Sequence, residues 1–438
     1  MENVMNKKNR TKFFLTLVIF SLTGQIAWVV ENMYFNVFIY KMFGASAADI
    51  SLMVAASAVS ATLTTLFVGA LSDKLGKRRV FMCGGYILWG ISIISFCFIR
   101  TDVVGALFGA ASASAVCITL VIIMDCVMTF FGSSANDACF NAWLTDMTDN
   151  TDRGAAEGIN SMMPLVAILA VFGGFMAFDL GKSESWTMIF AIIGAVVVLI
   201  GIVGFFIIDE PKLEISQNQN YFANIFYGFR PSVIKENKML YLFLAAFAVF
   251  GISIQIFMPY LIIYYTAALK MENYVLIMAP AIILASVFTA FWGRFYDKVK
   301  FGGSVFPSLA LLMIGYVILY FFRGTALVFI GSLLMMCGYL SGAAVFGAVI
   351  RDNTPENRAG MFQGLRIAFQ VLLPGIIGPA IGSAILKNAQ TIVNDDGTTS
   401  FIPNENIFLA ALVAAIVLIV FLFAVSHITK RTEVKNEN

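Results

Sequence analysis

Four ionisable residues stand inside long apolar runs of this 438-residue sequence, where a charged side chain is costly. They are Glu31, Asp125, Asp137 and Arg366. Placing such a charge at the centre of a membrane helix costs about 2.5–3.5 kcal/mol, so each one is a candidate for function. A carboxylate such as Glu31 could take a proton from water and release it again. The alternative for Glu31 is a hydrated position near the outer interface.

Asp125 and Asp137 fall on one apolar run, residues 103–141, which is too long for a single plain crossing. Which of the two lies at the bilayer midplane depends on where the helix begins. Asp137 and Asn141 share a helical face by their i,i+4 spacing. Asp137 therefore belongs either to a transport site or to the inner end of the helix, where it would cap backbone or bind Arg153.

Two helical stripes of polar residues accompany these charges. The first consists of Gln25, Asn32 and Asn36, and the second of Gln363, Arg366 and Gln370. Polar stripes in lipid must face the inside of a bundle, where they line water or hydrogen-bond a neighbouring helix. Trp28, beside Glu31, could stack on a sugar ring or a flat hydrophobic compound, or simply pack.

The composition indicates that these residues lie in a membrane protein. Hydrophobic residues make up 60% of the chain and charged residues 12%, against about 45–50% and about 25% in soluble domains. The excess lies in runs of about 20 residues, the length of a transmembrane helix. We predict an all-α protein with twelve transmembrane helices, at residues 13–40, 49–71, 80–99, 103–141, 158–178, 186–208, 239–265, 274–292, 305–322, 326–350, 362–386 and 407–426.

The distribution of lysine and arginine sets the expected orientation. With the amino terminus inside, 22 of the 28 basic residues fall in cytoplasmic segments. The positive-inside rule then places both termini in the cytoplasm, and an even number of crossings follows. The first apolar run is much longer than a secretory signal and is expected to stay as an anchor. We expect a multi-pass protein of the plasma membrane.

The remaining chemistry-bearing residues exclude several classes of protein. The six cysteines contain no CxxC pair, and the single histidine excludes a histidine-rich metal cluster. No GxxxxGK[ST] loop for ATP occurs, and no HExxH or GxSxG motif points to an enzyme. The net charge of +2 gives no indication of a nucleic-acid partner. We therefore predict no cofactor, no metal site, no nucleic-acid binding and no enzymatic activity.

An internal repeat divides the chain into related halves. GALSDKLGKRR at residues 69–79 returns in degraded form as GRFYDKVK at residues 293–300, and residues 138–154 resemble residues 344–360. Equivalent loops leave equivalent helices in each half, which indicates parallel repeats. We predict two pseudo-symmetric six-helix bundles, at residues 1–210 and 239–438, joined by a cytoplasmic linker at residues 211–238.

The first repeat motif resembles the signature loop between helices 2 and 3 of the major facilitator superfamily. The matching positions are Gly69, Asp73, Lys74, Gly76, Arg78 and Arg79, echoed at Gly293 and Asp297. The resemblance implies two bundles that rock about a central site and expose it alternately to each side. Gly69 would permit close helix approach. Asp73 could pair with Arg153, and Asp297 with Arg358, in one orientation of the bundles, unless the bases are merely positive-inside anchors.

Weaker similarities concern the subfamily. The loop after the fourth helix and its copy are similar to the glycoside–pentoside–hexuronide cation symporters, but the second helix lacks the carboxylates that bind cations there. A fragment similar to the antiporter signature, residues 378–383, lies in the eleventh helix rather than the fifth. The first departure weakens the prediction of a sodium site like that of those symporters. The second weakens the prediction of an exporter.

The sequence thus predicts a secondary active transporter for a small polar solute, either sugar-like or of another kind, driven by a proton or sodium gradient. Its expected partners are the lipid bilayer, the solute and the coupling cation, and we expect a monomer. The first alternative is a proton-driven exporter of amphipathic compounds. A second alternative, from another class, is a non-transporting membrane protein such as a sensor or an intramembrane enzyme.

Overall fold

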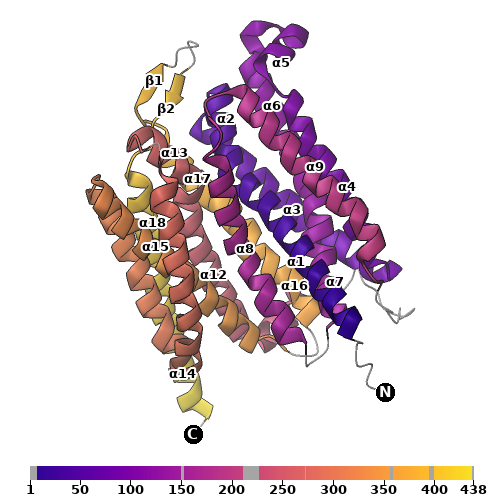
Figure 1. The fold of residues 1–438 in the computed structure, drawn as a ribbon. Coiled ribbons are helices and arrows are strands. Elements are labelled where there is room, and N and C mark those ends of the chain that lie inside the picture. Colours follow the sequence, from indigo (N-terminus) through magenta and orange to yellow (C-terminus); the bar gives the residue numbers. More distant parts are fainter. Residues whose placement is uncertain are drawn as a thin grey trace. The chain divides into compact units, whose positions relative to one another are not determined.

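The computed structural model describes residues 7–148, 152–210, 226–271, 273–355, 359–393 and 399–436. The chain folds into two compact units (Figure 1). Unit 1 comprises Met1–Ala45 and Ala56–Ile225, and unit 2 comprises Ser46–Ala55 and Phe226–Asn438. The division of the chain at the predicted linker, residues 211–238, stays a prediction.

Unit 1 contains six long helices and several short turns. Its elements are α1 Lys7–Val29, η1 Val30–Tyr34, α2 Phe35–Phe43, α3 Ala47–Leu75, α4 Arg78–Ser95, η2 Phe96–Phe98, α5 Thr101–Phe108, η3 Ala110–Ser112, α6 Ala113–Gly132, η4 Ser133–Phe140, α7 Asn141–Asp146, α8 Arg153–Phe175 and α9 Ser183–Ile207. The first nine residues of α3 are counted with unit 2. Because α1, η1 and α2 follow one another directly, they make one membrane-crossing helix, and α6, η4 and α7 make another.

Unit 2 follows the same plan with one hairpin added. Its elements are η5 Tyr227–Phe229, α11 Pro231–Glu236, α12 Lys238–Phe257, η6 Met258–Tyr260, α13 Leu261–Ile263, η7 Tyr264–Ala268, α14 Val275–Phe321, α15 Thr325–Asp352, α16 Ala359–Ile367, η9 Ala368–Leu372, α17 Leu373–Leu386, β1 Thr391–Val393, β2 Thr399–Phe401 and α18 Asn406–Asn436. The strands pair antiparallel, with Ile392 opposite Ser400. They lie in the connection between α17 and α18.

Eleven helices of the described chain are long and apolar enough to cross a membrane. One of them, α14, has 47 residues, more than twice the length that a crossing needs. Its backbone breaks at Lys300, where φ is 57° and ψ is −167°, so two crossing helices meet there. The structure therefore confirms twelve transmembrane helices in two six-helix bundles.

Four of the crossing helices contain a turn of π-helix: η1, η4, η7 and η9. A π-turn inserts one extra residue into the helix and is frequent at functional sites. Three of these turns hold candidate residues from the sequence, namely Glu31, Asp137 and Gln370. The sequence pattern does not predict these turns.

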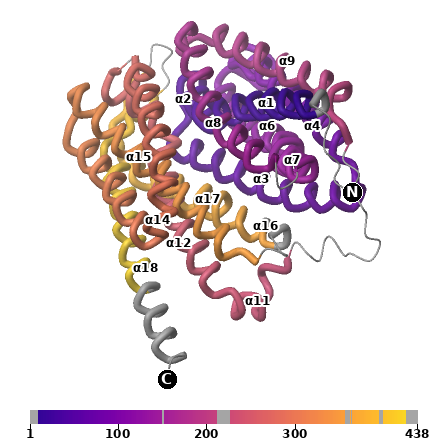
Figure 2. Tube along the Cα trace, turned by 60° about the horizontal axis from the view of Figure 1, so that its bottom comes forward, coloured from indigo at the N-terminus to yellow at the C-terminus, as the bar shows by residue number. Residues whose placement is uncertain are grey.

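Two connections have structure of their own. The residues before α6 form the separate short helix α5 beside it (Figure 1). Gly109 ends this segment at a φ of 91°, which favours glycine. In the linker, the described part forms η5 and α11, which precede α12 (Figure 2), and residues 211–225 lie outside the described residues.

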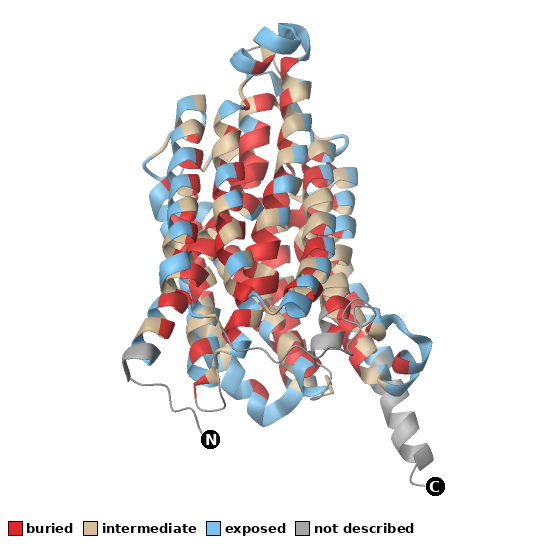
Figure 3. Ribbon diagram, turned by 90° about the vertical axis from the view of Figure 1, so that its right-hand side faces the viewer, coloured by how far each residue is buried: buried red, intermediate tan, exposed pale blue. Residues whose placement is uncertain are grey.

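Glycines allow close contact between helices within each unit, and many large apolar side chains remain exposed. A Cβ on Gly90 of α4 would lie 2.6 Å from the carbonyl oxygen of Gly194 on α9, so only glycine allows this approach. Leu199 and Phe206 on α9 and Val420 on α18 are among the many exposed large side chains. Figure 3 shows buried and exposed residues alternating along the helices. A surface of this kind suits contact with lipid.

Candidate functional site

A buried cluster of oxygen atoms joins three helices of unit 1. Glu31 lies in the π-turn η1 and is only 6% exposed. Its Oε1 accepts hydrogen bonds from Ser57 Oγ of α3 at 2.8 Å and from Thr129 Oγ1 of α6 at 2.7 Å. The two hydroxyl oxygens are 2.8 Å apart. The three oxygens therefore form a small triangle inside the bundle.

Asp125 adds a second carboxylate to this cluster. It lies one turn before Thr129 on α6, is 2% exposed, and is close enough to Glu31 for direct electrostatic repulsion. Glu31 Oε2 and Asp125 Oδ1 are both buried and have no hydrogen-bond partner among the described residues. Two buried carboxylates this close cannot both be ionised at low cost unless a cation joins them.

Asp137 occupies a separate polar cluster in η4. Its carboxylate accepts hydrogen bonds from Ser133 Oγ at 2.9 Å and from Asn136 Nδ2 at 3.2 Å. The Tyr86 hydroxyl is placed between Asn136 Oδ1, at 3.2 Å, and the Phe20 carbonyl, at 2.8 Å. This network links α1, α4 and η4, and it holds Asp137 in place within the bundle.

The pairing of Asp137 with Arg153, one of the alternatives from the sequence, is wrong. Arg153 Nη2 donates instead to the carbonyl of Thr145 at 3.3 Å. Asn141 is exposed, and its amide donates to the main-chain carbonyl of Asp137 at 3.1 Å rather than to the carboxylate.

The polar stripe on the first helix bonds mainly to its own backbone. The Asn32 and Asn36 amides donate to the carbonyls of Trp28 and Asn32, at 2.8 and 3.2 Å. Asn36 Oδ1 remains buried without a partner among the described residues, and Gln25 is half-buried. The Trp28 ring packs against Trp89, with ring centroids 5.0 Å apart, so one of its faces is occupied by protein.

In unit 2 the candidates Arg366 and Gln370 lie one turn apart, in α16 and η9. Arg366 Nε and Gln370 Nε2 are buried atoms with no hydrogen-bond partner among the described residues. Both atoms are donors. The stripe predicted from the sequence is therefore present for these two residues, and the side chain of Gln363 lies outside the described residues.

Arg78 is the centre of the predicted switch motif. Its guanidinium donates to Asp73 at 2.6 Å, to Asp146 at 2.9 Å, and to the hydroxyl of Ser72. The Arg78 side chain is 6% exposed, whereas that of Asp73 is 45% exposed. This ion-pair network ties the end of α3 to α4 and α7.

Glu210 anchors the beginning of α4 beside this network. Its carboxylate accepts the main-chain N–H groups of Arg78 and Arg79, the latter at 3.2 Å. An acidic group at a helix N-terminus accepts hydrogen bonds from the free N–H groups and interacts favourably with the helix dipole.

In this structure Asp73 pairs with Arg78, and Arg153 is bonded to Thr145 as described above. The pairing of Asp73 with Arg153 in one orientation of the bundles stays a prediction. A Cβ on Gly69 would lie 3.9 Å from that of Ala138, an ordinary contact, so close packing inside unit 1 does not require glycine there. Gly76 does require it, because its φ is 61°. Lys74 is exposed.

The second copy of the motif makes a related connection with different residues. The Tyr296 hydroxyl donates to Asp352 at 2.7 Å. Tyr296 occupies the position of Ser72 in the repeat, and Asp352 that of Asp146. Gly293 and Asp297 are exposed. The predicted partner of Asp297, Arg358, lies outside the described residues.

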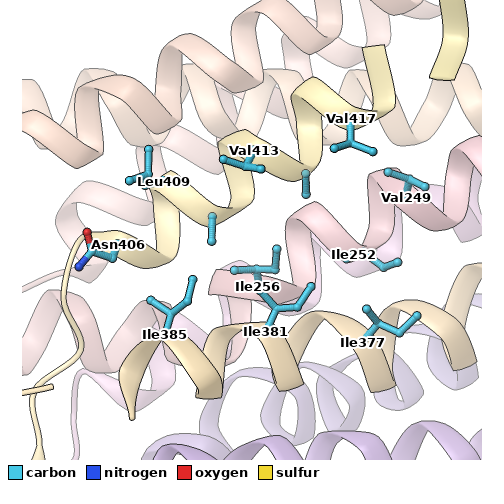
Figure 4. Close-up of a pocket in the computed structure, with 12 residues that line it drawn as sticks. Val249, Ile252, Ile256, Ile377, Ile381, Ile385, Asn406, Leu409, Val413 and Val417 are labelled. Carbon is cyan, nitrogen blue, oxygen red and sulfur yellow. The ribbon is translucent and has the colours of Figure 1, made fainter. Parts of the chain in front are cut away.

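A groove of about 800 Å³ lies in unit 2 between α12, α17 and α18 (Figure 4). Isoleucine, valine, leucine and alanine line it, and Asn406 at one end is its single polar lining residue. Because its lining is almost entirely apolar, this groove does not suit a polar solute. None of the candidate residues from the sequence lies in it. No group of three or more His, Cys, Asp or Glu side chains that could hold a metal ion occurs in the described part of the chain.

Sequence reasoning missed Ser57 and Thr129, the two hydroxyl donors to Glu31. Serine and threonine are common in membrane helices, and several here bond only to their own helix, as Thr62 does to Ala58. Nothing in the spacing distinguishes the two that reach across. The one feature that could have indicated them is that both lie on helices next to the first helix.

Twelve crossing helices in two bundles, with charged groups buried inside them, define a multi-pass membrane transporter. A family model described as the Major Facilitator Superfamily matches residues 13–379. The chain belongs to this superfamily. This result confirms the resemblance of the loop at residues 69–79 and supports a transporter with a small-molecule substrate rather than an enzyme.

One known protein is similar in sequence to part of this chain, and several solved structures are similar to it in fold. The glucose transporter GlcP of Staphylococcus epidermidis is 25% identical over 175 residues, which cover 40% of this chain and 35% of that transporter. The match thus spans about a third of that protein's length. Among solved structures, a D-xylose–proton symporter has a TM-score of 0.71 at 12% identity, covering 93% of this chain and 97% of the other. A mutant of the nucleoside transporter NupG has a TM-score of 0.70 at 12% identity, with 93% and 98% covered. These likenesses show the fold alone.

Proposed function

We propose that this protein moves a small polar solute across the plasma membrane by alternating access, coupled to a proton or sodium gradient. The observation that carries the proposal is the cluster of Glu31, Asp125, Ser57 and Thr129. It is buried, built from helices of one bundle, and contains two carboxylate oxygens without a partner among the described residues. Carboxylates of this kind at membrane depth mark proton and ion pathways.

The cluster can bind a cation by simple electrostatics. A proton on either carboxyl group removes one of the two negative charges and supplies a donor for an unpartnered oxygen. A sodium ion would achieve the same neutralisation with carboxylate and hydroxyl oxygens as ligands. Because the cluster connects three helices, occupancy by a cation changes how firmly they are held together, which links binding to conformation.

The class of solute is drawn from the relatives. The named relatives carry glucose, xylose and nucleosides. A sugar-like solute is consistent with buried amides and a tryptophan on the first helix, from Gln25 to Asn36. We further propose that both termini are cytoplasmic, that the bundles divide at residues 210 and 239, and that the protein works as a monomer.

The Arg78 network is proposed to bias the conformational equilibrium. It holds the cytoplasmic ends of α3, α4 and α7 through a nearly buried guanidinium with three acceptors. If rocking of the bundles loosens these bonds in one orientation, their free energy favours the other. Tyr296 and Asp352 would act in the same way in unit 2.

The test is solute uptake by purified protein in sealed proteoliposomes. A thermal-shift screen with sugars, nucleosides, amino acids and dyes first identifies a solute, because a bound ligand stabilises by mass action. Uptake is then measured with an imposed proton gradient, an imposed sodium gradient, or neither. We expect one gradient to accelerate wild-type uptake and to have no effect on Glu31→Gln, which should still exchange solute.

Other outcomes identify the alternatives. Efflux of hydrophobic dyes with no uptake of any polar solute would favour the exporter. A protein that binds solute but never moves it across the vesicle membrane would overturn transport altogether.

A further inference from the structure

Arg366 and Gln370 hold two buried hydrogen-bond donors about one turn apart along the eleventh crossing helix. Arg366 lies in the last turn of α16, and Gln370 lies in the π-turn η9, which packs against α12 and α17. Arg366 Nε and Gln370 Nε2 have no acceptor among the described residues. A guanidinium has five donors and no acceptor, so only an acceptor from elsewhere can satisfy it.

The charges around Arg366 do not neutralise it. The nearby Arg351, at the end of α15, repels it. Asp352, next in the chain to Arg351, already accepts the hydrogen bond of Tyr296. Unit 2 contains an ion pair between Arg323 and Glu405, at 2.9 Å, but this pair does not involve Arg366. In the described part of the chain, no carboxylate is therefore paired with Arg366.

Unit 1 has the opposite balance. Its buried cluster holds two carboxylates, Glu31 and Asp125, with unpartnered oxygens and no cationic side chain bonded to them in the described residues. Glu31 and Asp125 of unit 1 thus lack a paired cation, and Arg366 of unit 2 lacks a paired anion, among the described residues. A charged group left uncompensated inside a protein is costly, so each bundle favours a ligand of opposite sign.

From this we infer that Arg366 and Gln370 bind the carboxylate of an anionic solute. The inference rests on the proposed transport function and narrows its substrate class. Arg366 can donate two parallel hydrogen bonds to one carboxylate, and Gln370 Nε2 can donate a third. The solute would then be a sugar acid or a similar small hydroxycarboxylate, which travels with the cation bound at Glu31 and Asp125.

An oxyanion could also come from the phosphate of a lipid, since Arg366 lies within three residues of the beginning of its span, Gly364–Leu386. A lipid phosphate and a solute carboxylate offer the same acceptor chemistry. The experiment separates them by carrying out the solute titration in nanodiscs made of phosphatidylcholine alone and, in parallel, with phosphatidylglycerol added.

The experiment compares matched neutral and acidic sugars on the full-length protein. Glucose and glucuronate differ only at one carbon, as do galactose and galacturonate; gluconate, lactate, succinate and inorganic phosphate complete the panel. The midpoint of thermal unfolding is measured for wild type, Arg366→Gln, Arg366→Lys and Gln370→Leu. Arg323→Gln is the matched control, because it removes an arginine of the same unit that is already paired.

We expect at least one carboxylate to bind wild type about tenfold more tightly than its neutral partner, as one charge-assisted hydrogen bond of about 1.4 kcal/mol would give. Arg366→Gln should abolish this preference, Arg366→Lys should keep part of it, and Arg323→Gln should leave it intact. Phosphatidylglycerol should not compete with the acid.

Three results would overturn the inference. They are equal binding of the neutral and acidic sugars, an anion preference that survives Arg366→Gln, and the absence of any Arg366-dependent anion effect across the panel. Competition by phosphatidylglycerol would assign the site to a lipid instead. Gradient-driven uptake of a neutral solute that still depends on Glu31 would leave the transport function standing while this inference fails.

Discussion

The hydroxyl of Thr129 donates a 2.7 Å hydrogen bond to Glu31 Oε1, across 98 residues of sequence. This bond joins the first and fourth crossing helices of unit 1 at the point where a buried carboxylate needs a donor. Ser57 supplies a second donor from α3 at 2.8 Å. Three helices are therefore held by one side chain whose charge depends on what it binds.

The bond between Thr129 and Glu31 can be measured by a double-mutant cycle. Thr129→Val keeps the shape of the side chain and removes a donor from a buried carboxylate, which should cost about 1–3 kcal/mol of stability. The cost should be smaller in a Glu31→Gln background, because the charge is gone. Thr119→Val on the same helix is the control, since its exposed hydroxyl bonds only to the carbonyl of Ala115. Equal costs for Thr129→Val in both backgrounds would contradict the direct interaction.

Arg78 should matter far more to stability than its neighbour Arg79. Arg78→Ala removes bonds to Asp73, Asp146 and Ser72 from a side chain that is 6% exposed, and should cost about 2–3 kcal/mol. The Arg79 side chain is 41% exposed and lies 3.9 Å from Glu210, so Arg79→Ala should cost about 0.5 kcal/mol or less. Thermal unfolding in detergent gives both values. Similar losses for the two variants would show that the network is not the source of the effect.

The two motif glycines should respond differently to a methyl group. Gly76→Ala forces a residue with a Cβ to keep a φ of 61°, at a cost of about 1–2 kcal/mol. Gly69→Ala places its methyl 3.9 Å from Ala138 inside a helix, so within unit 1 it should be neutral or slightly stabilising. If Gly69→Ala keeps full stability but slows transport, the need for glycine lies in the transport cycle. A loss of stability at Gly69 as large as that at Gly76 would refute this account of unit 1.

Tyr296 and Asp352 should act as a pair in unit 2. Tyr296→Phe removes the 2.7 Å hydrogen bond to Asp352 and should cost about 0.5–1.5 kcal/mol. Asp352→Asn in the Tyr296→Phe background should then have less effect than in wild type. Additive losses of unfolding free energy would mean that the two residues are independent.

The fold could be predicted from the sequence because long apolar runs with few charged residues are a strong sign of transmembrane helices. Sequence reasoning also identified Glu31 and Asp125, since a carboxylate within such a run is rare. The twelve helices, the repeat and the loop at residues 69–79 followed from the same patterns. The two crossings predicted at residues 274–292 and 305–322 agree with the break of the α14 backbone at Lys300.

The partners of the charged residues could not be predicted in the same way. Arg153 is the expected partner of Asp73 in one orientation of the bundles, whereas in this structure the turn at Gly76 brings Arg78, five residues away, back onto that aspartate. The hydroxyl of Thr129 looks in the sequence like any threonine that bonds to its own helix. A π-turn shifts the face of every following residue, so the side chains around Glu31 and Gln370 cannot be placed by counting along a regular helix.

Cation binding by purified protein, without any solute, tests the central claim most directly. Thermal unfolding is followed while sodium replaces choline at constant ionic strength, and separately while the pH is lowered, in wild type and in the double variant Glu31→Gln with Asp125→Asn. The account predicts that sodium or protons raise the unfolding temperature of wild type and that this gain disappears in the double variant. An equal gain in both proteins, or no gain in wild type from either cation, would contradict it.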